Sequence, residues 1–170
     1  MKKIMELLQN MKAKNEKKDN KGFSLVELII VIAIMAILVG IVGTQVLPYI
    51  NKSKEAKDFQ IINSYGTAAT TAYSSNAEKV QTNITFKVYA PGSDATAVAL
   101  SEEIKELTGY ATIDKLAGSA STAGKMASKK GKTIAEIQVS IDLTNKKITT
   151  QAYSDAACTK KVFDAIVTEL

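Results

Sequence analysis

The stretch Gly22-Phe23-Ser24-Leu25-Val26-Glu27-Leu28, with the apolar run that follows it to Val42, decides how this chain is organised. Residues 23–43 contain a single charged side chain, that of Glu27. A helix of this length rises about 30 Å, which is about the hydrocarbon thickness of a bilayer. Because the run is apolar on every face, it fits lipid or the interior of a helical bundle better than the surface of a soluble domain.

The carboxylate of Glu27 is the anomaly in this run. An ionisable side chain inside a membrane segment is costly, and by default it indicates a functional site with a charged partner. Ser24 and Glu27 have the spacing of a capping box, so the carboxylate can bond the first N–H groups of its own helix. We therefore expect a helix that begins after Phe23 and carries an acid in its first turn.

Residues 1–22 differ in composition from everything that follows. They carry seven lysines against three acids, a net charge of +4, whereas the whole chain carries +5. Basic flanks stay on the cytoplasmic side of a membrane, so the N-terminus is predicted inside and the remainder outside. Since most of the basicity belongs to this leader, the net charge does not indicate nucleic-acid binding.

The residues Lys21-Gly22-Phe23-Ser24-Leu25-Val26-Glu27-Leu28 resemble the processing site of type IV pilins and the related pseudopilins. The resemblance implies that a prepilin peptidase cleaves after Gly22 and N-methylates the new amino group of Phe23. It covers about 25 of the 170 residues. It also implies an α+β fold, in which a long N-terminal helix packs against a small antiparallel sheet.

Cleavage at Gly22 leaves the apolar helix attached to the exported domain, whereas ordinary secretory cleavage follows the apolar run and removes it. An α-amine titrates near ~8 and a glutamate near ~4.3, so the new Phe23 amine and Glu27 are both charged at neutral pH. In the family this glutamate pairs with the amine of a neighbouring subunit and sets the axial stagger. The resemblance assigns that assembly role to Glu27 and Phe23.

The resemblance further implies a structural subunit, the major pilin of a type IV pilus. Before assembly it is a single-pass protein of the cytoplasmic membrane, and afterwards it lies at the cell surface in a helical homo-oligomeric filament. The implied partners are prepilin peptidase, a pilus assembly ATPase, a platform membrane protein and membrane lipid. Two alternatives stay open: a pseudopilin of a type II secretion or DNA-uptake system, and a single-pass surface protein with a binding head.

Composition argues against an enzyme. The sequence has no histidine and one cysteine, Cys158, so neither a zinc site of ordinary spacing nor a Cys–His or Ser–His nucleophile can be built. We expect no metal and no cofactor, although a site made only of carboxylates stays open. Cys158 cannot form an intrachain disulfide and is expected to be small and partly buried. The lysine cluster Lys125, Lys129, Lys130 and Lys132 is interpreted as a solvated loop, and nucleic-acid binding is unlikely.

The helix is predicted in two halves, an apolar one over residues 23–48 and an amphipathic one over residues 49–75. Gly40, Gly43 and Pro48 weaken the junction, because glycine costs about 1 kcal/mol and proline about 3 kcal/mol in a helix interior. In related filaments this segment loses helix on assembly, and we expect the same here. The amphipathic half is predicted to bury apolar residues under a sheet and to expose Lys52, Lys54, Glu55, Lys57 and Asp58.

Residues 76–170 are predicted to form the head. Its clearest feature is a hairpin, in which alternation over 133–141 is followed by a turn at 143–146 and a return strand over 147–153. We also expect a strand at 84–89, a helix at 96–108 with Ser101 as a possible cap, a loop over 109–128, and a final segment, 154–170, that is ambiguous but favours a strand over 162–168.

Overall fold

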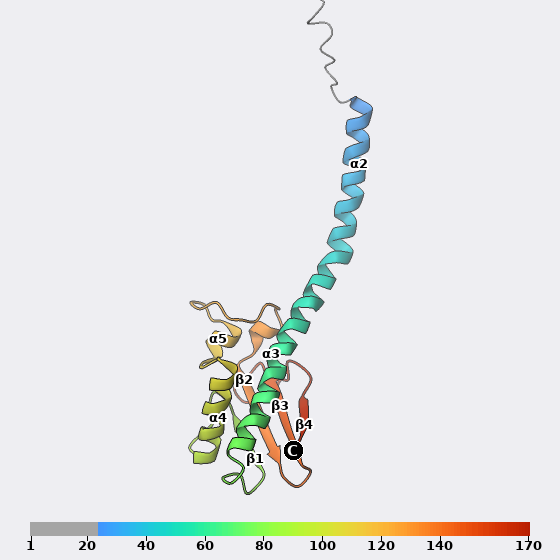
Figure 1. Ribbon diagram of the computed structural model, residues 1–170. Coiled ribbons are helices and arrows are strands. Elements are labelled where there is room, and N and C mark those ends of the chain that lie inside the picture. Colours follow the sequence, from blue (N-terminus) through green and yellow to red (C-terminus); the bar gives the residue numbers. More distant parts are fainter. Residues whose placement is uncertain (1–23) are drawn as a thin grey trace, which may run out of the picture. The chain divides into compact units, whose positions relative to one another are not determined.

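A computed structural model describes residues 24–170 (Figure 1). Residues 1–23 lie outside the described part, and with them the leader and the predicted cleavage site between Gly22 and Phe23. The chain divides into two compact units, Met1–Leu47 and Pro48–Leu170, which are described separately below. The predicted boundaries of the leader and of the two helix halves stay predictions.

The described part of the first unit is helical. Helix α2 covers Leu25–Ile41 and is followed by a π-helical turn, η1, over Val42–Val46. No residue of α2 or η1 is buried. A segment that is apolar all round and has no covering protein atoms is suited to lipid or to other apolar helices.

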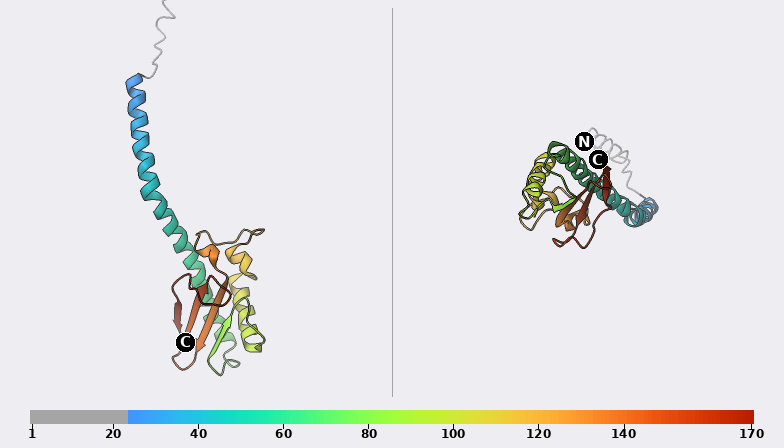
Figure 2. Two further views of the ribbon diagram at one scale, coloured as in Figure 1. Left: turned by 180° about the vertical axis from the view of Figure 1, so that it is seen from behind. Right: turned by 90° about the horizontal axis from the view of Figure 1, so that it is seen from below.

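The second unit combines helix α3, Leu47–Ser75, with a four-stranded antiparallel sheet of order β1-β2-β3-β4. The strands are β1 (Ile84–Lys87), β2 (Glu136–Asp142), β3 (Lys147–Tyr153) and β4 (Ile166–Glu169). Between β1 and β2 lie α4 (Ala95–Thr108), α5 (Ile113–Ala117) and the short 3-10 turn η2 (Gly131–Thr133). Figures 1 and 2 show α3 against one face of the sheet with α4 beside it. The fold is α+β, as expected.

One hydrophobic core joins α3, α4 and the sheet. The buried face of α3 carries small residues around two large ones, Ile62 and Tyr65, so that the helix can lie close to the strands. The sheet contributes alternate residues of β2, whose polar neighbours point the other way, as the period of two requires. The core also includes Leu100, Ile104, Ile137, Val139, Ile141 and Ile148. The predicted packing of the hairpin under the amphipathic helix is confirmed.

The predicted hairpin is confirmed, with Glu136 opposite Tyr153 and Asp142 opposite Lys147. The predicted strand is present as β1, which ends at Lys87 and not at residue 89, and the predicted helix at 96–108 is confirmed as α4. The cap of α4 is Asp94, whose side chain accepts from the Ala97 N–H at 2.8 Å, and Ser101 is instead buried inside the helix. Asp94 is the N-cap because it is the last residue with an extended backbone before the helix, and an N-cap residue has this position.

Two further expectations need correction. The segment 109–128 was expected to be a loop throughout, but it contains α5, which buries Leu116 and Ala117. In the final segment the strand is β4, which is shorter than expected and starts at Ile166. Tertiary contacts explain both differences. Elements of four or five residues, such as α5 and β4, have little local propensity and form only where the rest of the fold packs against them.

Thr150 in β3 offers a test of the core. Its Oγ1 is the one buried side-chain polar atom without a hydrogen-bond partner in residues 24–170. Because an unpaired buried hydroxyl is unfavourable, we expect Thr150→Val to raise the free energy of unfolding by about 1 kcal/mol. Urea unfolding in detergent, followed by circular dichroism, measures this. Thr149→Val, at a half-buried position on the same strand, should change it less; a lowered midpoint for Thr150→Val would contradict the expectation.

Candidate functional site

The N-terminus of α2 holds the candidate site. Ser24 is extended, with φ −60° and ψ 142°, and its side chain and that of Glu27 are arranged as a capping box. The Ser24 N–H donates to Glu27 Oε2 at 2.8 Å. The predicted cap is therefore confirmed: in a single chain the lone carboxylate of the apolar run lies over the first turn of its own helix, where the helix dipole favours an acid.

Gly22 and Phe23, the predicted cleavage and methylation residues, lie outside the described residues, so their roles stay predictions. The Ser24–Glu27 hydrogen bond does not depend on Gly22. Its donor belongs to the peptide bond between Phe23 and Ser24, which a cut after Gly22 leaves intact. A processed chain therefore keeps the Ser24–Glu27 cap and gains a charged amine one residue before it.

The surface next to this cap is apolar and uncovered. In residues 24–170, one helix, counted from Leu25 to Ser75, is long and apolar enough to cross a membrane. Side chains along its first part expose about half or more of their surface, for example Leu28 at 53% and Val39 at 67%. Such a large apolar surface requires lipid or a protein partner.

The π-helical turn at Val42–Val46 lies where Gly40, Gly43 and Pro48 were expected to weaken the helix. Pro48 has no N–H to donate to Thr44 O, and it lies in the first turn of α3, where a missing donor is best tolerated. The Thr44 hydroxyl donates back to Gly40 O at 3.0 Å. The chain is thus wound as a helix here, with an irregular turn; loss of helix on assembly stays a prediction.

The head contains a buried carboxylate that sequence reasoning missed. Asp58 was expected on the exposed face of the amphipathic helix but is 1% exposed. Its Oδ1 accepts from the Ala127 N–H at 2.8 Å, and its Oδ2 accepts from the Ser128 N–H at 2.8 Å and the Ser128 hydroxyl at 2.5 Å. Gly131 approaches the same carboxylate so closely that a side chain there would collide with it. Asp58 therefore fixes the loop before η2 to α3.

A second buried polar group lies at the start of β2. Alternation along β2 puts Glu136 on the polar side of the strand, with Gln138, yet it is 3% exposed, and its Oε1 accepts from the N–H groups of Tyr89 and Ile137. Burial raises the pKa of Glu136 above its usual range. Nearby, the Tyr65 and Tyr89 hydroxyls share a 2.5 Å hydrogen bond, and burial raises the pKa of Tyr89 to about 12. Both tyrosines therefore stay protonated at neutral pH. Together these hydrogen bonds connect Glu136 of β2, through Tyr89, to Tyr65 of α3.

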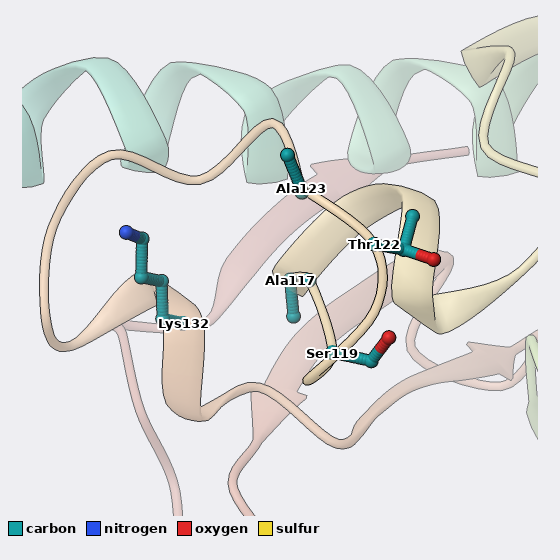
Figure 3. A pocket seen from close by; sticks show the side chains of 7 residues that line it. Ala117, Ser119, Thr122, Ala123 and Lys132 are labelled. Carbon is teal, nitrogen blue, oxygen red and sulfur yellow. The ribbon is translucent and has the colours of Figure 1, made fainter.

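No constellation in the described head points to catalysis. An open pocket beside α5 is lined by small residues and one cation, Lys132 (Figure 3). Cys158 is half-buried, with φ 57°, and burial raises the pKa of its thiol, which disfavours the nucleophilic thiolate. Within residues 24–170, no group of three or more Cys, Asp or Glu side chains is placed to hold a metal ion.

Comparison with known protein families gives a match at the N-terminus. The family model of the prokaryotic N-terminal methylation motif matches residues 17–43. This range contains Gly22, Phe23 and Glu27, and also Gly40 and Gly43. No curated protein and no solved structure matches the chain. The motif and the exposed apolar helix together fit anchoring in a membrane.

Proposed function

We propose that this chain, whose N-terminal methylation motif is the signature of type IV prepilins, is the major structural subunit of a type IV pilus. The observation that carries the proposal is the motif itself, placed on a helix that begins with the Ser24–Glu27 cap and exposes apolar side chains on all sides. Proteins with this motif are structural subunits, and the described head offers no competing catalytic arrangement.

Maturation would occur at the cytoplasmic face of the membrane. Prepilin peptidase cleaves between Gly22 and Phe23, removes the lysine-rich leader and methylates the Phe23 amine. The cut separates a hydrophilic segment from an apolar one, so the mature chain begins at the point where the helix enters lipid. The anchored subunit then has its N-terminus inside and its head outside.

Assembly would transfer α2 from lipid into the core of a filament. The transfer itself is nearly neutral, because lipid tails and packed aliphatic side chains are similarly apolar. Glu27 favours the filament over the lipid, since a buried carboxylate is tolerated when an opposite charge and hydrogen bonds compensate it. The methylated Phe23 amine of a neighbouring subunit supplies that charge and fixes the register. An assembly ATPase and a platform membrane protein drive the transfer.

A pseudopilin of a secretion or DNA-uptake machine is the second candidate, because it shares the processing motif. Long surface fibres that contain this chain as their main component favour the pilin, whereas a short periplasmic or envelope filament favours the pseudopilin. A single-pass surface protein with a binding head is the third candidate. It differs from both in predicting that Lys21 and Gly22 are still attached in the mature chain.

N-terminal mass spectrometry of the chain from membrane and surface fractions tests the proposal. We expect the mature protein to begin with N-methyl-Phe23. Gly22→Val should leave the leader attached, because a branched side chain replaces the glycine after which the peptidase is proposed to cleave. Gly40→Ala, which alters another glycine of the matched range, should be processed normally. A wild-type chain that retains Gly22 would overturn the proposal.

A further inference from the structure

We propose that seven exposed lysines of the second unit, Pro48–Leu170, bind anionic lipid headgroups of the leaflet from which the apolar helix emerges. These residues, here called the basic collar, are Lys52, Lys54, Lys57, Lys125, Lys129, Lys130 and Lys132. The partner is a lipid surface, recognised by negative charge. The inference rests on membrane anchoring by the apolar helix and does not depend on assembly into a pilus.

The two parts of the collar lie together although they are far apart in sequence. Asp58, one residue after Lys57, accepts hydrogen bonds from the backbone of residues 127 and 128. Lys130 Nζ lies 4.7 Å from the centre of the Phe163 ring, which in turn is 6.1 Å from the ring of Phe59. The loop that carries Lys129 and Lys130 is therefore held beside residues 58 and 59 of α3, and Figure 1 shows this loop at the same end of the unit as the start of α3.

The collar is strongly positive, whereas the rest of residues 48–170 is slightly acidic, with eight lysines against eleven acids. Within residues 52–58 and 125–132, the seven lysines face two acids, Glu55 and Asp58. Asp58 is buried and bonded to the loop backbone, which leaves Glu55 as the exposed acid of the collar. Acids gather elsewhere, as at Glu102, Glu103 and Glu106 of α4. The head thus presents positive charge at the end where α3 begins.

Chain length places Lys52, the first lysine of the collar, next to the end of the apolar run, and Lys57 within about 17 Å of it. Lys52 follows Ile50, an apolar residue that is 44% exposed, by two positions, and follows η1 by six. At about 1.5 Å per residue, Lys52 lies within about 9 Å of Val46, whatever the angle between the two units. That distance matches the headgroup region, and flexible lysine stems extend the reach of the ammonium group. Each lysine near an anionic surface contributes about 1 kcal/mol.

Other anionic partners fit less well. Duplex DNA or the acidic α4 of a second copy would also attract the collar, but each must diffuse to it. The lipid surface is held next to the collar by the chain itself, so its effective concentration is high in every anchored subunit. Binding to lipid would keep the free subunit oriented and would be released, in a salt-dependent manner, when the subunit leaves the membrane.

Lysine labelling in nanodiscs tests this inference on the full mature chain. We would use discs of phosphatidylcholine alone and discs with about 30 mol% phosphatidylglycerol, with an uncharged acetylating reagent and mass spectrometry of each lysine. Lys54 and Lys57 should be acetylated about threefold more slowly in the anionic discs at about 0.05 M salt, and equally in both discs at about 0.5 M salt. Lys146, in the hairpin turn, and Lys147, at the start of β3, lie at the far end of β2 and are internal references.

A triple variant, Lys129→Gln with Lys130→Gln and Lys132→Gln, distinguishes two causes of slow acetylation. One is contact of the collar with lipid headgroups, and the other is the negative potential at the surface of an anionic disc. The variant's matched control is Lys79→Gln with Lys146→Gln and Lys147→Gln, which removes three exposed lysines outside the collar; Lys105 of α4 then replaces Lys146 and Lys147 as the internal reference. If the head binds lipid, Lys54 and Lys57 regain fast acetylation in the first variant and not in the control. Equal slowing in both variants would overturn the inference, because surface potential alone gives that result.

Two further results would also overturn the inference. One is protection of Lys54 and Lys57 by added duplex DNA without any effect of phosphatidylglycerol. The other is protection that follows the number of chains per disc instead of the lipid. If the triple variant fails to fold by circular dichroism, Lys132→Gln alone replaces it, since Lys132 is exposed and lies at the rim of the pocket in Figure 3.

Discussion

We expect Glu27→Ala to abolish filament formation while membrane insertion and leader cleavage continue. If Glu27 pairs as proposed, the variant leaves the Phe23 amine of each neighbour without its carboxylate, and an unpaired charge in an apolar core costs about 3–5 kcal/mol. Since about 1.4 kcal/mol is a factor of ten, each subunit contact should weaken by roughly two to four orders of magnitude. Electron microscopy of sheared surface fractions, with immunoblots of the membrane pool, measures filaments and precursor separately.

The Ser24–Glu27 hydrogen bond makes it possible to separate the charge of Glu27 from its role as a cap. Glu27→Gln keeps an oxygen that can accept from the Ser24 N–H but removes the negative charge. We expect Glu27→Gln to fail like Glu27→Ala, because pairing with the amine requires the charge. Glu102→Ala, which removes an exposed acid of α4, is the matched control and should assemble normally. Normal filaments from Glu27→Gln would show that capping, and not pairing, is the role of this residue.

Patterns with a strong local cause were predictable from the sequence. The apolar run could be assigned because it leaves no polar face, and the hairpin because alternation over β2 and β3 flanks a turn. The Ser24–Glu27 cap followed from spacing alone. The candidate site was predictable for the same reason: its residues are neighbours in sequence, and their chemistry is unusual for the segment that contains them.

The interior contacts of the head could not be predicted in the same way. Asp58 and Glu136 look like solvent-facing charges within their periodic segments, and only the loops that cover them supply their hydrogen-bond donors. The collar shows the same limit, because its loop lysines and its helix lysines are about 70 positions apart and are brought together by Asp58. The periodicity of a sequence indicates which face of a helix or strand is buried. It does not indicate which loop covers the polar residues of that helix or strand.

Asp58 is therefore the residue of the head whose loss we expect to be most damaging. Asp58→Ala leaves two N–H groups and one hydroxyl, of Ala127 and Ser128, without their acceptor in a buried site. Hydrogen bonds to a charged acceptor contribute about 1.5–3 kcal/mol each, and their losses overlap at one site. We expect the free energy of unfolding to fall by about 3–5 kcal/mol. Urea unfolding in detergent, followed by circular dichroism, measures it.

Two comparisons show whether the loss comes from these hydrogen bonds. Glu55→Ala removes an exposed acid one turn earlier on the same helix and should change stability by less than about 0.5 kcal/mol. Asp58→Asn keeps one acceptor and should lie between Asp58→Ala and the wild type. Hydrogen exchange at Ala127 and Ser128 should accelerate first, because their N–H groups lose protection directly. If Asp58→Ala is no less stable than Glu55→Ala, the loop is held by its apolar contacts, with Met126 packed beneath it, and the position of the collar lysines does not depend on this carboxylate.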